Sequence, residues 1–407
     1  MISLRGMLQS MEGRQRESNK MSAESNSLFP HLKTEQVSPR TTGILPAQTI
    51  RELIAGGHLK ASEAITEEQI QPASIDLRLG EVAYRVRASF LPGQDSTVKE
   101  KISALLITKL DLTGGVVFEP GCVYIVPLRE ELRLPKNVEA RANPKSTTGR
   151  LDIFTRLITD YGTEFERVRP GYRGRLFAEI VSRTFTIQVR TGMKLNQLRF
   201  MRGNPPSHDG ALAELDEREN LVYEDDEGPV KAKIDRGLRI SARLNAEGET
   251  ELVAFRAKKH APAIGLGVRD FYDPREYWDA VYSVQGRGIV LDPGDFYLLA
   301  SKEKVRVPPD YAAEMVPYDQ SIGEFRVHYA GFFDPGFGYG LSDVPGTLAV
   351  LEVRAHEVPI LIEHGQTVGR LIYSPMLARP DKIYGVQIGS SYQMQGLALS
   401  KQFKKWP

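Results

Sequence analysis

The chain has 407 residues, a length that fits two to three domains of about 150 residues each. Its 53 Lys and Arg residues balance 52 Asp and Glu residues, and a net charge of +1 argues against a protein that coats nucleic acid. The chain has one cysteine, Cys122, which excludes an intrachain disulfide and a cysteine-based zinc site. It has neither an 18-residue apolar run nor a signal-peptide core, so we expect a cytoplasmic protein without membrane spans.

The N-terminal part of the sequence changes character near residue 44. Residues 1–43 are rich in Ser, Glu, Arg, Gln and Asn and have little hydrophobic periodicity, so we expect a disordered tail. The following stretch, 48–59, carries Ile50, Leu53 and Ile54 at the spacing of one helix face, which predicts a short N-terminal helix.

Short alternating or apolar runs, broken by glycine and proline, dominate the rest of the chain and predict an all-β fold. The clearest runs are 74–79, 115–118, 122–126, 176–181 and 184–189. The stretch 205–235 holds a proline pair and two acidic runs, and we interpret it as a solvated acidic linker between units over 44–204 and 236–407. Residues 270–280 are polar and aromatic and fit neither a helix nor a strand pattern.

The two units match each other at a fixed spacing of 173 residues. The matching pairs are Pro120 and Pro293, Tyr124 and Tyr297, Pro135 and Pro308, Pro144 and Pro317, Glu179 and Glu352, and Gly192 and Gly365. Between them the Pro-Gly pairs at 170 and 335 are offset by 165, so the second copy loses eight residues and then regains them. Turn chemistry explains recurring Pro-Gly pairs but not the apolar positions shared around the two glutamates, so we predict an internal repeat.

Four motifs and a C-terminal pattern carry a family resemblance. The motifs are Gln-Pro-Ala-Ser-Ile-Asp-Leu-Arg-Leu-Gly (71–80), Lys-Ser-Thr-Thr-Gly-Arg (145–150), Ala-Gly-Phe-Phe-Asp-Pro-Gly-Phe (330–337) and Val-Leu-Glu (350–352), followed by Tyr384, Tyr392 and Gln395-Gly396. In order, they resemble the N-terminal strand signature, the phosphate and catalytic loop, the nucleoside-binding hairpin, the strand of the catalytic glutamate and the closing tail of dCTP deaminases in the dUTPase-like superfamily. The resemblance spans about 45–400 and implies tandem dUTPase-like (β-clip) distorted β-barrels.

The resemblance also implies a reaction, ligands and a set of site residues. The reaction is the hydrolytic deamination of dCTP to dUTP and ammonia, by a water that a glutamate activates and without zinc. The catalytic candidates are Glu352, Glu179, Ser146 and Arg150, and the nucleotide-binding candidates are Lys145, Ser146, Thr147, Thr148, Ala330, Asp334, Val350, Leu351, Tyr384, Tyr392 and Gln395. Mg²⁺ is expected with the triphosphate. The family further suggests inhibition by dTTP and, because its single-copy members are trimers, a homo-oligomer with a multiple of three repeats; no nucleic acid or membrane is expected as a partner.

The residues themselves support this chemistry. A carboxyl group whose pKa is tuned toward neutrality by partial burial can take a proton from water and return it to a leaving amine, and Glu179 and Glu352 each lie inside an apolar strand. The loop 145–150 offers hydroxyl donors and positive charge for a triphosphate, although the Gly-Lys-Ser of a P-loop is absent. Without the resemblance, a solvent-facing glutamate and a Ser/Thr-rich turn would be the ordinary interpretations.

The two copies are degenerate in complementary ways. Where the first copy keeps Lys145, Ser146 and Arg150, the second has Tyr318, Asp319 and Gly323; where the second has Asp334, the first has Arg169. We therefore predict a composite site, with the loop from the first copy and the hairpin, Glu352 and tail from the second. A site built around Glu179 is the rival arrangement.

Two other functions stay open at this point. A dUTPase, or a bifunctional dCTP deaminase and dUTP diphosphatase, fits the same fold, and the segment 167–174 faintly resembles a dUTPase hairpin. A non-catalytic nucleotide-binding regulator is the alternative from another class. Ammonia release, pyrophosphate release and binding without turnover separate the three functions.

Overall fold

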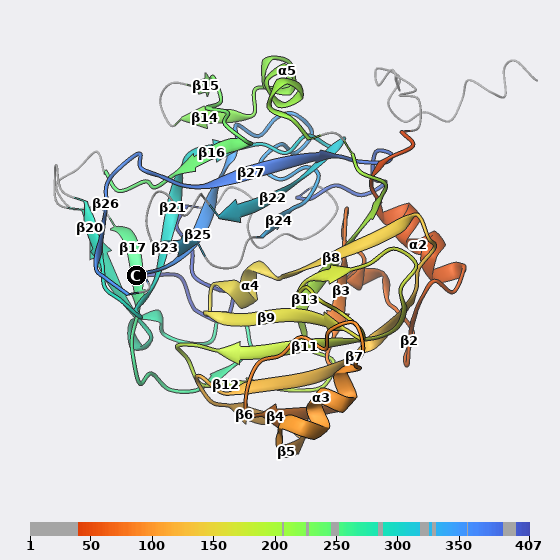
Figure 1. The fold of residues 1–407 in the computed structure, drawn as a ribbon. Helices are drawn as coiled ribbons and strands as arrows, with labels where there is room; N and C mark the ends of the chain where they lie inside the picture. Colours follow the sequence, from red (N-terminus) through yellow and green to blue (C-terminus); the bar gives the residue numbers. More distant parts are fainter. Residues whose placement is uncertain are drawn as a thin grey trace, which may run out of the picture. The chain divides into compact units, whose positions relative to one another are not determined.

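The structure of the chain is a computed structural model that describes 40–205, 207–224, 228–245, 252–283, 288–317, 325–327, 331–355, 357–385 and 396–407. Most of the tail expected over 1–43 lies outside the described residues. From Arg40 the chain belongs to one unit that runs to Pro407, and its architecture is mostly β (Figure 1).

Three sheets are built from strands of the first half of the chain. The first sheet runs β1 (Gly43–Ile44), β13 (Lys194–Arg202), β8 (Val138–Pro144) and β10 (Arg167–Val168), with β3 (Ile75–Arg78) beside β13. The second runs β5 (Leu106–Asp111), β4 (Val82–Val86), β7 (Val123–Arg133), β11 (Arg173–Ser182) and β9 (Ile153–Thr159), with β2 (Leu59–Ala61) beside β7. The third, small sheet joins β6 (Val116–Phe118) and β12 (Ile187–Val189) to β18 (Ile264–Gly265) from the second half.

The second half repeats this division into two larger sheets and a small one. One sheet runs β15 (Gly228–Val230), β14 (Val222–Glu224), β21 (Phe296–Val305), β17 (Leu252–Ala257) and β19 (Trp278–Tyr282), with β25 (Thr347–Ala355) beside β21 and β23 (Phe325–Val327) beside β25. Another runs β16 (Leu238–Ser241), β27 (Thr367–Pro375), β22 (Tyr311–Pro317) and β24 (Phe332–Phe333). The small sheet pairs β20 (Ile289–Leu291) with β26 (Ile360–Ile362).

Strand register agrees with the 173-residue spacing in the sequence. In the first half Glu179 of β11 pairs with Ile125 of β7, and in the second half Glu352 of β25 pairs with Leu298 of β21. The partner residues are thus displaced by the same 173 positions as the two glutamates. Each of the expected strand runs contains a strand. The run at 122–126 extends to Arg133, where β7 pairs with β11 on one side and with β2 on the other.

Helices are few and short. They are α2 (Ala47–Ala55), α3 (Val98–Leu105), α4 (Ser146–Gly149) and α5 (Asp209–Glu219), with single 3₁₀ turns η1 (Glu67–Gln69) and η2 (Pro274–Glu276). The predicted N-terminal helix is confirmed as α2, which buries Ile50 and Leu53 and ends at Ala55, before Gly56. No helix of the described ranges is both long and apolar enough to cross a lipid bilayer.

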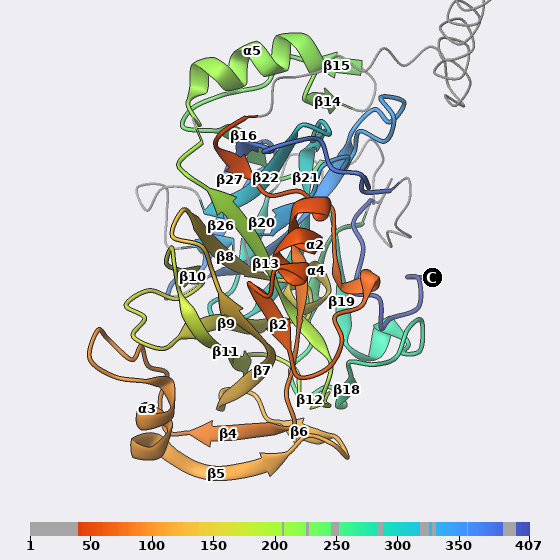
Figure 2. The same ribbon diagram turned by 90° about the vertical axis from the view of Figure 1, so that its right-hand side faces the viewer.

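The stretch 205–235 differs from the expected solvated linker. It contains α5 and the strand pair β14–β15, which lie together on one side of the second half (Figure 2). Leu212 and Leu215 are buried, and the buried carboxylate of Asp216 accepts hydrogen bonds from the backbone N–H groups of Leu221 and Ala232 at 3.0 and 2.9 Å. Two leucines among acidic residues give a weak apolar pattern, which is why composition alone suggested solvent exposure.

The largest hydrophobic cluster crosses the boundary between the halves. Phe185 of the first half packs with Trp278 of the second at a ring distance of 5.4 Å, and Phe255 lies 6.3 Å from Trp278. The stretch 270–280, which the sequence pattern left unassigned, supplies η2, β19 and this aromatic contact. The two halves therefore share one core.

Candidate active site

The loop 145–150 is a single helical turn, α4, held on the edge of strand β13. Backbone hydrogen bonds run from Lys145 N to the Leu195 carbonyl oxygen at 2.9 Å and from Arg150 N to the Ser146 carbonyl oxygen at 3.1 Å. The hydroxyl group of Thr148 donates to the same Leu195 carbonyl oxygen at 3.1 Å. Strand β13 thus holds the turn in place through Leu195, and Ser146 of the turn is exposed.

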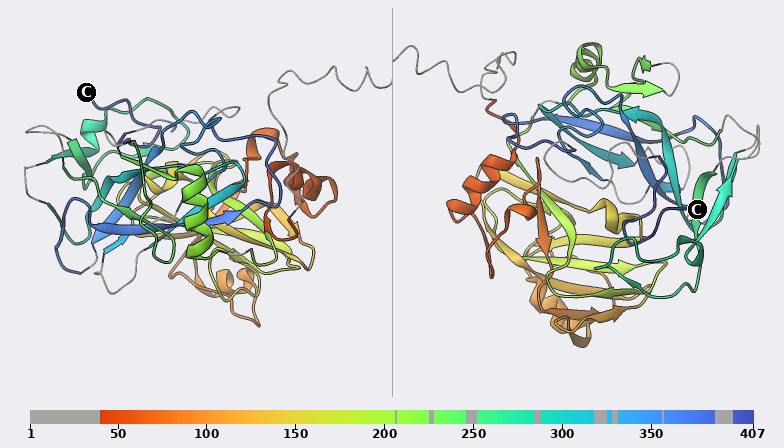
Figure 3. Two further views of the ribbon diagram at one scale, coloured as in Figure 1. Left: turned by 90° about the horizontal axis from the view of Figure 1, so that it is seen from above. Right: turned by 180° about the vertical axis from the view of Figure 1, so that it is seen from behind.

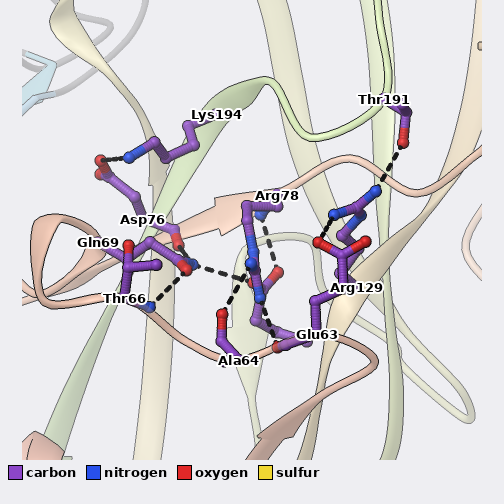
Figure 4. A network of polar contacts seen from close by, with 10 residues as sticks. Glu63, Ala64, Thr66, Gln69, Asp76, Arg78, Arg129, Thr191 and Lys194 are labelled. Atoms are coloured by element: carbon purple, nitrogen blue, oxygen red, sulfur yellow. Dashed lines mark hydrogen bonds and ion pairs between the residues drawn. The ribbon is translucent and has the colours of Figure 1, made fainter. Parts of the chain in front are cut away.

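Asp76 of β3 holds the basic residue at the start of this turn. Its buried carboxylate forms ion pairs with the ammonium group of Lys145 and, at 3.9 Å, with that of Lys194 (Figure 4 shows the Lys194 pair). Asp76 belongs to the motif at 71–80, so the ion pair between Asp76 and Lys145 connects this motif to the loop at 145–150.

Strand β25 presents Glu352 to the loop. Because strand residues alternate between faces, Leu351 and Val353 pack into the core of the second half while Glu352 points the other way. The Glu352 side chain lies directly against Gly149: a Cβ atom on that glycine would stand 2.6 Å from Oε1 of Glu352. Because Gly149 has no side chain, the carboxyl group of Glu352 can occupy this space.

The hairpin around Asp334 forms the opposite wall. Asp334 is buried and forms an ion pair with Arg199 of β13, at 3.2 Å from Oδ1 to Nη2. Phe337 packs edge-on against Phe333 at a ring distance of 4.9 Å and stands 5.6 Å from the ring of Tyr384, whose backbone N–H donates to the Pro335 carbonyl oxygen. Aromatic rings therefore form the surface of the hairpin at this wall.

The loop, the strand and the hairpin enclose one cavity of about 170 Å³. Its lining residues come from the two halves: Gln71, Lys145, Ser146, Thr147, Arg150 and Gln197 from the first, and Met315, Gly331, Phe332, Phe333, Asp334, Phe337, Leu348, Ala349, Val350, Glu352 and Tyr384 from the second. A single chain thus joins the loop of one half to the glutamate and the hairpin of the other.

Burial dominates the electrostatics of Glu352. The residue is 6% exposed, and removal from water raises the pKa of its carboxyl group well above the usual 4.5 because the charged form loses hydration. The nearby guanidinium group of Arg150 acts in the opposite direction, and Asp152 raises the pKa of Glu352 further. A carboxyl group in this setting holds a proton more readily than an exposed glutamate does.

An ion pair of Arg354 ties strand β25 to the first half. Arg354, two residues after Glu352 on the same strand face, binds the buried carboxylate of Asp152 and also donates to the hydroxyl group of Thr184 at 2.9 Å. Asp152 follows α4 by three residues, so this ion pair fixes strand β25 beside the turn.

Glu179 lies elsewhere, in a closed environment. Its side chain is fully buried and paired with Arg156, whose Nε lies 3.0 Å from Oε1, and it does not line the cavity that contains Glu352. The ring of Phe165 stacks on the Arg156 guanidinium group at 3.7 Å. The same strand face carries Phe177, which packs under Val98 of α3. The described residues therefore do not bring Glu179 to the loop.

The other predicted site residues divide into three groups. Lys145, Ser146, Thr147, Arg150, Asp334, Val350 and Tyr384 line the cavity. Two expectations are corrected: the side chain of Leu351 packs in the core because it alternates with Glu352, and that of Thr148 is buried and bonded to Leu195. Ala330, Tyr392 and Gln395 lie outside the described residues, as do Tyr318, Asp319 and Gly323.

Several lining residues were not singled out from the sequence. Gln71 lies within a motif that was recognised, and Phe332, Phe333 and Phe337 lie within another, so their position in the motifs was a usable signal. Gln197 had none, because it reaches the cavity only through the pairing of β13 with β8. Within the described ranges, His, Cys, Asp and Glu side chains form no group of three or more that could hold a metal ion.

Comparison with known proteins gives consistent matches. Residues 41–204 match the family model of the 2'-deoxycytidine 5'-triphosphate deaminase N-terminal domain, and residues 208–403 match that of its C-terminal domain. A dCTP deaminase of Natronomonas pharaonis is 32% identical over 123 residues, covering 30% of this chain and 59% of that protein. A dUMP-forming dCTP deaminase of Coprothermobacter proteolyticus is 30% identical over 158 residues, covering 39% of this chain and 81% of that protein.

A solved structure is similar over a longer range. The 2'-deoxycytidine 5'-triphosphate deaminase of Agrobacterium tumefaciens is 49% identical, covers 83% of this chain and 100% of its own, and superposes with a TM-score of 0.77. The two family models together span nearly all of the described residues, on both sides of the cavity. The chain therefore belongs to the 2'-deoxycytidine 5'-triphosphate deaminase family.

Proposed function

We propose that this chain deaminates dCTP hydrolytically to dUTP and ammonia in the cavity between its halves. One observation carries the proposal: the buried carboxyl group of Glu352 lies against the turn at 145–150, within a cavity that an aromatic hairpin closes. The matched family models and the similar A. tumefaciens structure support the choice of substrate.

In the proposed mechanism Glu352 moves one proton. Its carboxylate takes a proton from a water molecule as the water oxygen bonds to C4 of the cytosine ring. The electron pair of the C4–N3 double bond moves to N3 as the water oxygen adds. The same carboxyl group then gives its proton to the amino nitrogen, the C4–N4 bond breaks and ammonia leaves, while the second water proton passes from the C4 hydroxyl to N3 as the C4 carbonyl forms. The raised pKa of Glu352 makes its carboxylate a stronger base than that of an exposed glutamate, and the guanidinium group of Arg150 favours the ionised form.

The remaining lining residues position the substrate in this proposal. The base and sugar lie against Phe332, Phe337 and Tyr384, while the hydroxyl of Ser146 and the ammonium group of Lys145 bind phosphate oxygens. Mg²⁺ bound to the triphosphate would lower its negative charge. Asp76, whose carboxylate lies beside the loop, is already paired with Lys145, so phosphate oxygens and water would supply most ligands of the ion.

An ammonia-release assay with dCTP tests this function. We expect ammonia and dUTP in equal amounts, and full activity after dialysis against a zinc-specific chelator. Tight dCTP binding without ammonia would instead identify a nucleotide-binding regulator. Loss of activity that only zinc restores would contradict the role of Glu352 as the sole activator of water.

A second activity has a specific observation in its favour. Several relatives, including those from C. proteolyticus, Halobacterium salinarum and Nanoarchaeum equitans, are dUMP-forming dCTP deaminases. Analysis of the nucleotide product decides between the two: dUMP with pyrophosphate would show a bifunctional enzyme, and dUTP a deaminase alone. Pyrophosphate release from added dUTP is the direct test of diphosphatase activity.

The fold and assembly of the proposed enzyme follow from the repeat. The equal registers around Glu179 and Glu352 support two copies of one dUTPase-like distorted barrel, joined in tandem. We propose a homo-oligomer with a multiple of three repeats and inhibition by dTTP. Light scattering measures the mass of the assembly, and dCTP deamination at increasing dTTP concentration measures the inhibition.

A further inference from the structure

A buried ion pair accompanies the contact between Glu352 and the turn at 145–150. It joins Arg354, the next residue on the Glu352 face of β25, to Asp152, the third residue after Gly149. Asp152 is fully buried and Arg354 is 5% exposed. In the right-hand view of Figure 3 the first half, in orange and yellow, lies below the second half, in cyan and blue, so this pair spans the boundary between them.

The guanidinium group of Arg354 makes several directed contacts. Its Nη2 also donates to the hydroxyl group of Thr184 at 2.9 Å, and its Nη1 donates to the Gly294 carbonyl oxygen. The hydroxyl group of Thr184 donates in turn to Oδ2 of Asp152 at 2.6 Å. One planar group thus holds three oxygen atoms, from both halves of the chain, in fixed directions.

The backbone of Asp152 has an unusual conformation. Its φ angle is 55°, in the left-handed region that few residues other than glycine adopt. Its N–H group donates to the Gly149 carbonyl oxygen at 2.8 Å, and its carbonyl oxygen accepts from the N–H group of Arg183 at 3.0 Å. Such conformations persist where the surrounding contacts hold them, and they cluster at active sites. Here the conformation follows the turn directly and brings the carboxylate to strand β25.

The first half has no counterpart of this ion pair. Glu179 and Glu352 have matching registers, but two residues further along the strand the first half has Val181 where the second has Arg354. The carboxylate of Glu179 pairs instead with Arg156 of the neighbouring strand. The Asp152–Arg354 pair therefore accompanies the glutamate that lines the cavity and is not a general feature of the repeat.

Ionisable groups reach the surroundings of the Glu352 carboxyl group from every element packed against it. They are Lys145, Arg150 and Asp152 from the turn and the residues after it, Asp334 from the hairpin, Tyr384 from the segment after β27, and Arg354 from β25 itself. The charge of Asp152 raises the pKa of Glu352, whereas that of Arg150 lowers it. The ion pair therefore holds one of the charges that act on Glu352.

We propose that Asp152 and Arg354 are positioning residues for the deamination, and that their ion pair holds the Glu352 carboxyl group at the turn where it meets the substrate. The inference rests on the proposed function and adds two residues that touch neither dCTP nor the reacting atoms, since neither lines the cavity. Residues that serve stability alone would leave the kinetics and their pH dependence unchanged.

Two substitutions separate the charge of the pair from its geometry. Asp152→Asn keeps the shape of the side chain, and loss of the negative charge lowers the pKa of Glu352, so the acidic limb of kcat/KM should move to lower pH. Arg354→Lys keeps the charge but cannot bind all three oxygen atoms. Its kcat should fall about tenfold or more, because the reacting groups are misplaced, while KM and the acidic limb stay close to those of the wild type.

The matched control is Asp216→Asn, which changes another buried aspartate, in α5 and outside the cavity. It should lower the Tm and leave kcat and the acidic limb unchanged. Melting temperatures show which variants fold. If Arg354→Lys does not fold, the double variant Asp152→Asn/Arg354→Met takes its place, because it leaves no unpaired buried charge, and it should show the same loss of kcat.

Measurements on the wild type separate this inference from the proposed function. An unmoved acidic limb in Asp152→Asn, or a wild-type kcat in Arg354→Lys, would overturn the inference while ammonia release from dCTP by the wild type upholds the function. A wild-type protein that releases no ammonia from dCTP would refute the function, and with it the role of this ion pair.

Discussion

Glu179 and Glu352 hold the same register position in their strands, yet their carboxyl groups meet different partners. Glu179 is neutralised by Arg156 in a closed, apolar environment, whereas the Glu352 side chain faces a cavity and lies against Gly149. The ion pair with Arg156 holds the Glu179 carboxylate away from the cavity that Glu352 lines. The two glutamates therefore differ in the groups around their carboxyl groups and not in their positions within the strands.

Replacement of each glutamate by glutamine tests this difference. Glu352→Gln is expected to lower kcat by about 10²–10⁴-fold or more, because the amide keeps the size of the side chain but cannot take a proton. Binding of dCTP should remain. Glu179→Gln should keep turnover and lower the free energy of unfolding by about 1–3 kcal/mol, since Arg156 loses its charged partner.

Steady-state kinetics, dCTP binding and chemical denaturation should be measured on both variants side by side. An inactive Glu179→Gln enzyme beside an active Glu352→Gln enzyme would move the proton transfer to the first half of the chain.

The pH dependence of kcat/KM reports the pKa of Glu352 in the free enzyme. Burial raises this pKa, so activity should fall on acidification well above pH 4.5, the usual pKa of a glutamate. Arg150 lowers the pKa of Glu352, so Arg150→Met should move the acidic limb to higher pH as well as reduce the rate. An acidic limb at the same pH in both enzymes would show that another group titrates.

At the element scale, the turn α4 needs a glycine at position 149. Gly149 is buried beneath the carboxyl group of Glu352, and any larger residue must displace that group. Gly149→Val should therefore reduce kcat by at least about tenfold, the effect of roughly 1.4 kcal/mol on the barrier. Gly114→Val is the control, because a Cβ atom at that glycine meets no atom within 4 Å.

The first-half segment 164–167 differs from its second-half counterpart, and it lines a separate pocket of about 310 Å³ together with Arg156 and Glu314. Counted back from the Pro-Gly pairs, Phe165 and Glu166 stand where the second half has Ala330 and Gly331, so large side chains replace small ones. Burial raises the pKa of Glu166 to about 8, against a backbone hydrogen bond from Leu157 that lowers it. Two other groups nearby, Arg156 and Glu314, lower and raise this pKa respectively.

The raised pKa of Glu166 predicts a pH effect on stability. The folded state keeps this proton up to about pH 8, while the unfolded chain releases it near pH 4.5, so the contribution of Glu166 to stability falls as the pH rises between these values. Glu166→Gln cannot ionise. Its Tm relative to the wild type should therefore rise between about pH 5 and pH 8, and a constant difference in Tm would contradict the shift.

Sequence patterns predicted the elements that depend on neighbouring residues and failed for features that depend on contacts between distant parts of the chain. The alternation within 74–79 and 176–181 and the helical spacing of Ile50 and Leu53 were sufficient for β3, β11 and α2. Helix α5 was missed because its apolar face has few residues, and it is stabilised by the carboxylate of Asp216 and by burial against the second half. The order of the motifs in the sequence was enough to predict which segments form the cavity. The sequence does not reveal the long-range pairs that hold these segments together, such as Arg199 with Asp334.

At the scale of the whole molecule, the shared core makes the two halves interdependent. Trp278 lies between Phe185 of the first half and Phe296 of the second, and β18 of the second half extends a sheet of the first. We expect residues 40–407 to unfold in one transition, with equal calorimetric and van't Hoff enthalpies.

Trp278→Ala tests this coupling. Loss of the buried indole should cost about 3–5 kcal/mol and lower the Tm of the whole unit, with no separate transition for either half. Two transitions in scanning calorimetry, with only one of them shifted, would show that the halves are independent.

The cavity is assembled from both halves of one chain, and this has a genetic consequence. When a site forms between identical subunits, two inactive variants can restore activity by mixing, because some interfaces combine the intact parts of each. Here Ser146 and Glu352 of the same cavity are inherited on the same polypeptide. Co-expression of a Ser146→Ala chain with a Glu352→Gln chain should therefore yield no active enzyme beyond that of the separate variants, and each defective copy of the gene should behave as recessive.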